Sequence, residues 1–147
     1  MRRVALSLAL ALLAAGVAAA ADETPAGAPG PILTLQIDSI IHPVAAELIA
    51  EAVAEADVRD AQSLVIQLNT PGGLLTSTRE ISSAMLEADT PVVVFVSPQG
   101  SQAASAGFFL LMAADVAAMA PGTNTGAAHP VGGQGEDIEG VMAEKVE

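Results

Sequence analysis

A serine stands among small residues at the start of an apolar segment. Ala-Ala precedes Ser105 and Ala-Gly follows it, and residues 108–114 (FFLLMAA) come next. That segment predicts a buried helix, so Ser105 would lie where unpaired N–H groups and the positive end of the helix dipole favour an anion. The small neighbours would let a substrate backbone come close. The pattern fits a nucleophile beside an oxyanion site, and it also fits an ordinary helix cap, which is the commoner role of such a serine.

A pair of glycines offers a second group of candidate residues. Gly72 and Gly73 follow Pro71, two residues after the end of the largely apolar run 64–68. Without a Cβ, these residues can present backbone N–H groups to a ligand at close range. The same triplet is also typical of a plain strand-to-helix turn. A phosphate-binding loop is not indicated, because the sequence has neither G-x-G-x-x-G nor the P-loop lysine pattern.

Composition excludes several kinds of site. The chain has no cysteine, which rules out thiolate nucleophiles and cysteine-bound zinc. Its net charge of −12 argues against nucleic-acid binding, which depends on Lys and Arg at the phosphates. Glu47, Glu51 and Glu55 repeat at helical spacing, which is typical of a solvated face rather than a metal site. No metal and no cofactor is expected.

The elements that would position these residues alternate between strands and helices. This order at this spacing predicts an α/β fold with a parallel sheet and right-handed crossovers. The ends of neighbouring parallel strands would then bring residues 71–73 close to Ser105. The third strand, a continuous β-branched run, is expected to be buried on both faces. Strands are predicted at 32–37, 64–68, 91–96 and 116–119, helices at 43–56, 74–88 and from Ser105 to 114, and loops at 99–104 and 121–130.

The N-terminal region predicts export. Residues 1–21 combine two arginines, an apolar run and a closing alanine-rich stretch, which is typical of a cleaved signal peptide. An uncleaved membrane anchor is the alternative, since the run approaches the length of a membrane span. Residues 22–31 are rich in Pro, Gly and Ala and are interpreted as a disordered linker. Residues 32–147 then form one domain.

Three motifs in order carry a family resemblance. LNTPGG at 68–73, QAASAG at 102–107 and APGTNTGAA at 120–128 resemble the ClpP-like, crotonase-fold serine proteases. They are more similar to the N-terminal protease domain of the NfeD membrane-protease family. The resemblance covers residues 32–147 and implies a ClpP/crotonase-like parallel sheet with flanking helices, built from repeated ββα and βα units.

The resemblance also implies roles for individual residues. Ser105 would be the nucleophile. The N–H groups of Gly72 or Gly73, together with that of Ala106, would form the oxyanion hole.

The general base has two candidates. The resemblance to the NfeD family implies Lys145, the only lysine of the chain, in a Ser–Lys dyad. Such a dyad needs a neutral amine, which apolar surroundings favour by lowering the pKa of the lysine. His129 is the alternative, because its spacing from Ser105 resembles that of the catalytic histidine in ClpP. His42 is interpreted as a helix-entry residue.

The resemblance implies a serine endopeptidase that cleaves apolar segments of membrane-associated proteins, with a stomatin-like membrane protein as partner. The domain would act on the periplasmic or extracytoplasmic side, and longer family members are membrane-anchored. The 52% apolar composition favours a homo-oligomer, such as a dimer. Family members continue beyond the position that matches Glu147, so the domain is expected to be C-terminally incomplete and its activity stays open. A Ser–His protease, acyl-CoA chemistry on the same fold and a non-catalytic partner-binding scaffold are the alternatives.

Overall fold

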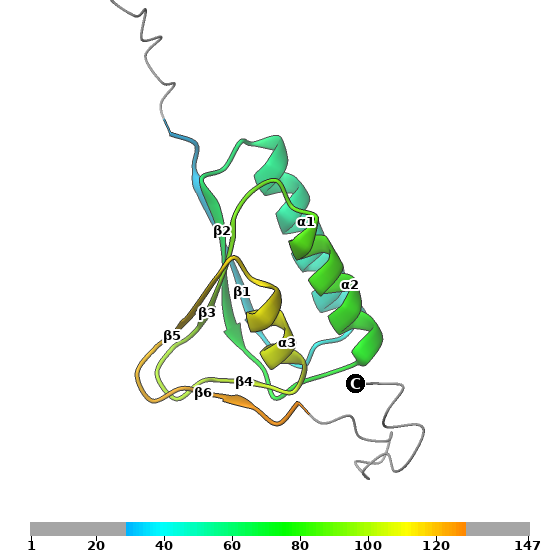
Figure 1. Ribbon diagram of the computed structural model, residues 1–147, viewed down its shortest axis with the longest axis vertical. Helices are drawn as coiled ribbons and strands as arrows, with labels where there is room; N and C mark the ends of the chain where they lie inside the picture. Colours follow the sequence, from blue (N-terminus) through cyan, green and yellow to red (C-terminus); the bar gives the residue numbers. More distant parts are fainter. Residues whose placement is uncertain (1–28, 129–147) are drawn as a thin grey trace, which may run out of the picture.

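Parallel strands and the helices that connect them organise the chain (Figure 1). The computed structural model describes residues 29–128. The elements are β1 (Ile32–Asp38), α1 (Pro43–Val58), β2 (Ser63–Asn69), α2 (Leu75–Leu86), β3 (Val92–Val96), β4 (Gln102–Ala104), α3 (Ala106–Ala113), β5 (Val116–Met119) and β6 (Asn124–Gly126).

The main sheet has the order β1-β2-β3-β5, and every neighbouring pair is parallel. Parallel neighbours need a crossover between them, and α1, α2 and α3 lie in those crossovers. Figure 1 shows all three of these helices on one face of the sheet. The predicted α/β fold with a parallel sheet is confirmed, and the strands end at the edge where α2 and α3 begin.

The core lies between the sheet and the helices. Every second side chain of β2 is buried, namely Leu64, Ile66 and Leu68, and β3 shows the same alternation. The expectation that the third strand is buried on both faces is wrong. Val93 and Phe95 are only half-buried, because the helices of the described region lie on the opposite face.

Helix α1 begins as its sequence predicts. His42 is the N-cap, and its Nδ1 accepts a hydrogen bond from the Val44 N–H at 3.2 Å. Pro43 occupies the first turn, where its missing N–H costs nothing. The glutamates at 47, 51 and 55 are exposed, so both the helix-entry role of His42 and the solvated acidic face are confirmed.

Two short strands occupy segments that were expected to be loops. β4 falls within 99–104 and β6 within 121–130, and the two pair in parallel, with Ala103 opposite Thr125. Each has only three residues, and their pairing is non-local, so neither shows a strand periodicity. Ser105 therefore follows β4 rather than leaving the third strand of the main sheet through a simple loop.

The predictions on the N-terminal region concern residues outside the described range. The predicted signal peptide at 1–21 lies there, as does most of the 22–31 linker. Within residues 29–128, the helices are too short or too polar to cross a membrane.

Candidate active site

Two loops meet at Ser105, as the strand order predicts. A Cβ on Gly72 would lie 2.8 Å from the Ser105 Cβ and 3.3 Å from its Oγ. The backbone of Gly72 therefore packs directly against the serine side chain, and its φ of 124° is one that glycine adopts most readily. Any other residue at this position would collide with the candidate nucleophile.

Ser105 has a strained backbone. Its φ is 49° and its ψ is −109°, at a sharp turn between β4 and α3. A non-glycine residue in such a conformation costs on the order of 1–3 kcal/mol and is found mainly at functional sites. Its side chain makes no capping hydrogen bond to α3, and the residue is half-buried. The simple helix-cap interpretation of Ser105 therefore does not hold.

Thr70 links the two loops, although the sequence analysis quoted it only as part of the LNTPGG motif and predicted no role for it. Its side chain is buried, and its Oγ1 accepts from the Gly72 N–H at 3.2 Å and lies 3.1 Å from the Gly72 carbonyl oxygen, to which it can donate. Its backbone N–H donates to the Gln102 carbonyl at 2.7 Å, and its own carbonyl accepts from the Ala104 N–H at 3.0 Å. A hydroxyl side chain just before Pro-Gly-Gly is typical of a turn, which is the signal that could have found it.

Asn69 adds a second link at the same edge. Its Nδ2 donates to the Asp38 Oδ1 at 2.8 Å, and its Oδ1 accepts from the Gln102 N–H at 3.0 Å. One amide side chain thereby joins β1 to β4, the strand that leads to Ser105.

Gly107 lets α3 start close to the end of β2. A Cβ at this position would lie 2.7 Å from the Thr70 Cγ2 and 3.1 Å from the Ala103 Cβ. The absence of a side chain brings the first turn of α3, including Ala106, against the loop that holds the two glycines.

The two glycine N–H groups differ in availability. The Gly72 N–H is engaged by the Thr70 hydroxyl. Gly73 forms a parallel bridge with Ile41, in which the hydrogen bonds come from its neighbours: the Ile41 N–H donates to the Gly72 carbonyl and the Leu74 N–H to the Ile41 carbonyl. In this pattern the Gly73 N–H points away from Ile41.

Two backbone donors therefore remain beside the serine. Within residues 29–128, neither the Gly73 N–H nor the Ala106 N–H has a hydrogen-bond acceptor. Ala106 is the first residue of α3, where the N–H has no partner within the helix. A pair of such donors can stabilise a developing oxyanion.

Both candidate bases lie outside the described residues. Lys145 and His129 fall in the segment 129–147, so the structure neither joins them to Ser105 nor separates them from it. The described histidine, His42, is the cap of α1. Residues 29–128 contain no group of three or more His, Cys, Asp or Glu side chains that could hold a metal ion.

The sequence matches a protein family over most of its length. Residues 32–145 match the family described as "NfeD1b, N-terminal domain". The membrane-bound protease PH1510 of Pyrococcus horikoshii is 36% identical over 85 residues, which are 58% of this chain and 19% of that protein. Membrane protein NfeD1b of Bacillus subtilis is 30% identical over 104 residues, which are 71% of this chain and 23% of that protein. The chain thus spans about a fifth of the length of these relatives.

Solved structures share the fold. A lysine-to-alanine mutant of the 1510-N membrane-bound stomatin-specific protease, in complex with a substrate peptide, superposes with a TM-score of 0.73 at 30% identity. That match covers 80% of this chain and 55% of the other. A serine-to-alanine mutant of 1510-N gives a TM-score of 0.70 at 29% identity, covering 77% and 56%. ClpP1 from Listeria monocytogenes, at 22% identity and a TM-score of 0.63, covers 76% and 64% and shows the fold alone. The predicted ClpP-like architecture is confirmed.

Proposed function

The chain belongs to the NfeD1b N-terminal domain family, and from this premise we propose that it is a serine endopeptidase with Ser105 as its nucleophile. The Ser105 Oγ attacks a peptide carbonyl as a base removes its proton. The amine leaves after it receives that proton, and water then releases the acyl group from Ser105.

The observation that carries this proposal is the conformation of Ser105. Its backbone is strained, its side chain makes no capping bond, and the glycine loop packs against it. A serine whose only role was to cap α3 would need neither the strain nor the contact with Gly72.

We assign the oxyanion hole to the N–H groups of Gly73 and Ala106. Gly72, the other glycine of the sequence-based hypothesis, already donates its N–H to Thr70. Its role would be to leave room for the serine side chain, and Thr70 would be a positioning residue that fixes the turn carrying Gly73. The negative charge that develops on the carbonyl oxygen would meet the Gly73 donor on one side and the first turn of α3 on the other.

Lys145 is our candidate for the base. The related 1510-N protease was solved with a lysine replaced and, separately, with a serine replaced, which supports a pairing of these two residue types. A neutral lysine amine can take the proton from Ser105 and return it to the leaving amine. His129 is the second candidate, because an imidazole acts as a base near neutral pH without a large shift of its pKa.

The substrate would be an apolar segment of a membrane-associated protein. The name of 1510-N describes a protease specific for stomatin, and a peptide complex of it is known. Both sequence relatives are named as membrane proteins. For this chain we also propose a stomatin-like partner, export to the extracytoplasmic side and assembly into a homo-oligomer such as a dimer.

Labelling with a fluorophosphonate, read by intact mass, tests the chemistry. The wild-type protein should gain one adduct, and Ser105→Ala should lower the labelling rate by roughly 10³-fold or more, because the nucleophile is gone. Lys145→Ala should have a comparable effect, while His129→Ala should label as the wild type does. Loss in His129→Ala alone would reassign the base. Adduct formation that persists in Ser105→Ala would refute the proposal. A wild-type protein that stays unlabelled across the pH range would also refute it and would favour the non-catalytic scaffold role.

A further inference from the structure

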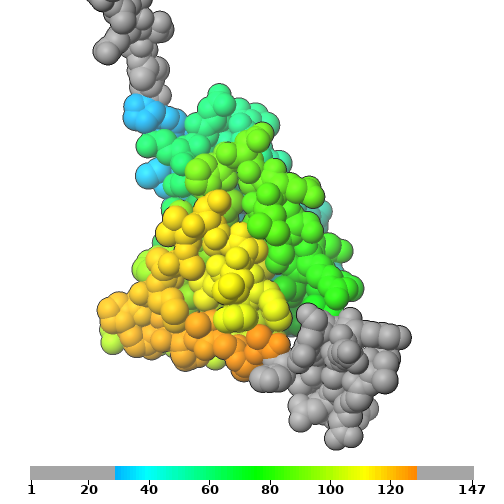
Figure 2. Space-filling view, in the orientation of Figure 1, coloured from blue at the N-terminus to red at the C-terminus, as the bar shows by residue number. Residues whose placement is uncertain are grey.

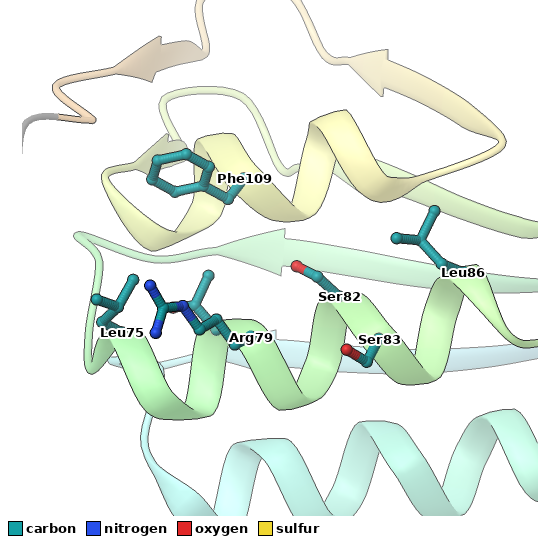
Figure 3. A pocket seen from close by; sticks show the side chains of 7 residues that line it. Leu75, Arg79, Ser82, Ser83, Leu86 and Phe109 are labelled. Atoms are coloured by element: carbon teal, nitrogen blue, oxygen red, sulfur yellow. The ribbon is translucent and has the colours of Figure 1, made fainter. Parts of the chain in front are cut away.

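A groove runs between α2 and α3. The two helices begin at the same edge of the sheet and lie side by side, as their adjoining surfaces in Figure 2 show. The space between them has a volume of about 400 Å³ and is open to solvent. Figure 3 shows side chains from both helices around this space, with Leu75 and Arg79 at the end where α2 begins and Leu86 at the other end.

Two residues that line the groove follow closely after residues of the candidate active site in the sequence. Leu75 follows Gly73 by two residues, and Phe109 lies about one helical turn after Ser105. The α2 residues that line the groove, from Leu75 to Leu86, span about 16 Å at the rise of a helix. An extended peptide of about five residues has the same length.

Large apolar side chains line the groove and are exposed. Leu75 is 40% exposed, Phe109 is 42% exposed, and Leu86 is 73% exposed. Scattered exposed leucines are ordinary, but three large side chains gathered around one groove mark a surface that gains from being covered. An apolar segment is the ligand that would cover them.

One positive charge stands in this groove. The Arg79 side chain is exposed and has no ion pair with any residue of 29–128. The other arginine of that region, Arg59, lies at the end of α1 and pairs with Glu55 at 3.4 Å. On a protein with a net charge of −12, an isolated cation beside apolar side chains is complementary to a carboxylate of the ligand.

We infer that the α2/α3 groove binds about five residues of the substrate next to the scissile bond, in the form of an apolar segment that carries one carboxylate. Leu75, Leu86 and Phe109 contact the apolar side chains, and Arg79 pairs with the carboxylate. This inference rests on the proposed protease function, because it treats the groove as an extension of the Ser105 site.

Peptide binding to the uncleaving Ser105→Ala variant tests the inference separately from the chemistry. The probes are three fluorescein-labelled pentapeptides of Leu, Val and Ala with a central Asp, Asn or Lys, measured by fluorescence anisotropy. The Asp peptide should bind about three- to five-fold more tightly than the Asn peptide, since an exposed ion pair contributes modestly. Arg79→Gln should remove that difference, and Arg79→Glu should shift the preference to the Lys peptide.

Matched controls exist for both kinds of contact. Arg59→Gln removes the other arginine and should leave the preference intact. Phe109→Ala should weaken all three peptides by about five-fold or more, as loss of an aromatic anchor does. Met112→Ala, on the same helix at a side chain that is 70% exposed and outside the groove, should have no effect.

The outcomes separate this inference from the proposed function. With Ser105 present, the rate of labelling by a small fluorophosphonate tests the proposed function, and it should be unchanged in the control variants Arg59→Gln and Met112→Ala, because both side chains lie outside the groove. The inference would be overturned, even if labelling succeeds, if Arg79→Gln and Arg59→Gln bound the peptides alike. It would equally be overturned if Phe109→Ala and Met112→Ala bound them alike. It would also be overturned if Phe109→Ala dissociated an oligomer in analytical ultracentrifugation, since a second copy would then occupy the groove.

Discussion

The two ends of the main sheet differ in whether their backbone N–H groups are hydrogen-bonded. At the end where the strands begin, two carboxylates hold backbone N–H groups: the Asp57 Oδ1 accepts from Thr90 and the Asp115 Oδ2 accepts from Val92, each at 2.8 Å. At the end where the strands finish, Ser105 is strained and the N–H groups of Gly73 and Ala106 have no acceptor within residues 29–128.

This contrast indicates that the strand starts stabilise the fold and that the candidate chemistry lies at the strand ends. Hydrogen bonds that are already formed stabilise the fold, but a donor must remain available if it is to stabilise a transition state. Changes at the strand ends should therefore alter reactivity, and changes at the strand starts should alter the free energy of unfolding.

Gly73→Ala should nearly abolish labelling of Ser105. A Cβ at this position would lie 2.0 Å from the Ile41 carbonyl oxygen, so the loop must move and its N–H must leave its present direction. Loss of one oxyanion donor lowers the rate by about 10²–10³-fold. The measurement is the fluorophosphonate labelling rate on protein shown to be folded by circular dichroism.

Gly100→Ala is the matched control for that substitution. Gly100 is another loop glycine, with a φ of 87°, but a Cβ there meets nothing within 4 Å. Its replacement should cost on the order of 1 kcal/mol of stability and leave the labelling rate unchanged. Equal labelling rates in Gly73→Ala and Gly100→Ala would contradict the assignment of Gly73 to the oxyanion hole.

Thr70→Val should reduce labelling by about ten- to a hundred-fold, because a displaced donor is costly even when it is still present. Valine keeps the shape of threonine but removes the hydroxyl that bonds to Gly72. The measurement is kcat and KM for a peptide substrate beside the labelling rate, and the loss should fall on kcat. Thr70→Ser keeps the hydroxyl and should recover most of the rate; if it were as slow as Thr70→Val, packing rather than the hydroxyl would explain the defect.

Asp115→Ala should destabilise the protein without slowing the chemistry. It removes the acceptor of the Val92 N–H, and an unpaired buried N–H costs about 1–3 kcal/mol. Urea unfolding should show this loss, while the labelling rate of the folded protein stays at the wild-type value. A labelling defect as large as that of Thr70→Val would show that the two ends of the sheet are not independent.

Asp57 should contribute a small acid dependence of stability. Hydrogen bonds from the Thr90 side chain and backbone hold the pKa of the Asp57 carboxyl below its ordinary value of 3.8. A lowered pKa means that the contribution to stability is present above pH 3.8 and is lost as the pH falls below it, through the folded-state pKa. Urea midpoints measured from neutral to acidic pH should fall less steeply for Asp57→Asn than for the wild type, and identical slopes would contradict this role.

Much of the architecture was predictable because it is encoded locally. Alternation identifies β1, largely apolar runs identify β2 and β3, and helical spacing identifies α1 and α2. Their alternation predicts the parallel sheet, and parallel order predicts that the Pro-Gly-Gly loop meets Ser105. The candidate nucleophile and the candidate donors could therefore be identified from the sequence.

Burial within helix α1 was less predictable. Val44 and Leu48 are apolar and lie at helical spacing, but they are 56% and 45% exposed, while Ala45 and Ala46 are buried. The sequence shows which residues of a helix are apolar, but the packing of α1 against the sheet and α2 decides which of them are covered.

Local sequence patterns were enough to predict the order of the elements, the parallel sheet and a small set of candidate residues at one edge. The pairing of β4 with β6 and the φ of 49° at Ser105 became clear only from the fold. The same is true of the hydrogen bond that engages the Gly72 N–H and of the bridge that leaves the Gly73 N–H available. The physical reason is that strand and helix periodicity arises among near neighbours, whereas the direction of a hydrogen bond or the strain of one residue depends on partners far along the chain.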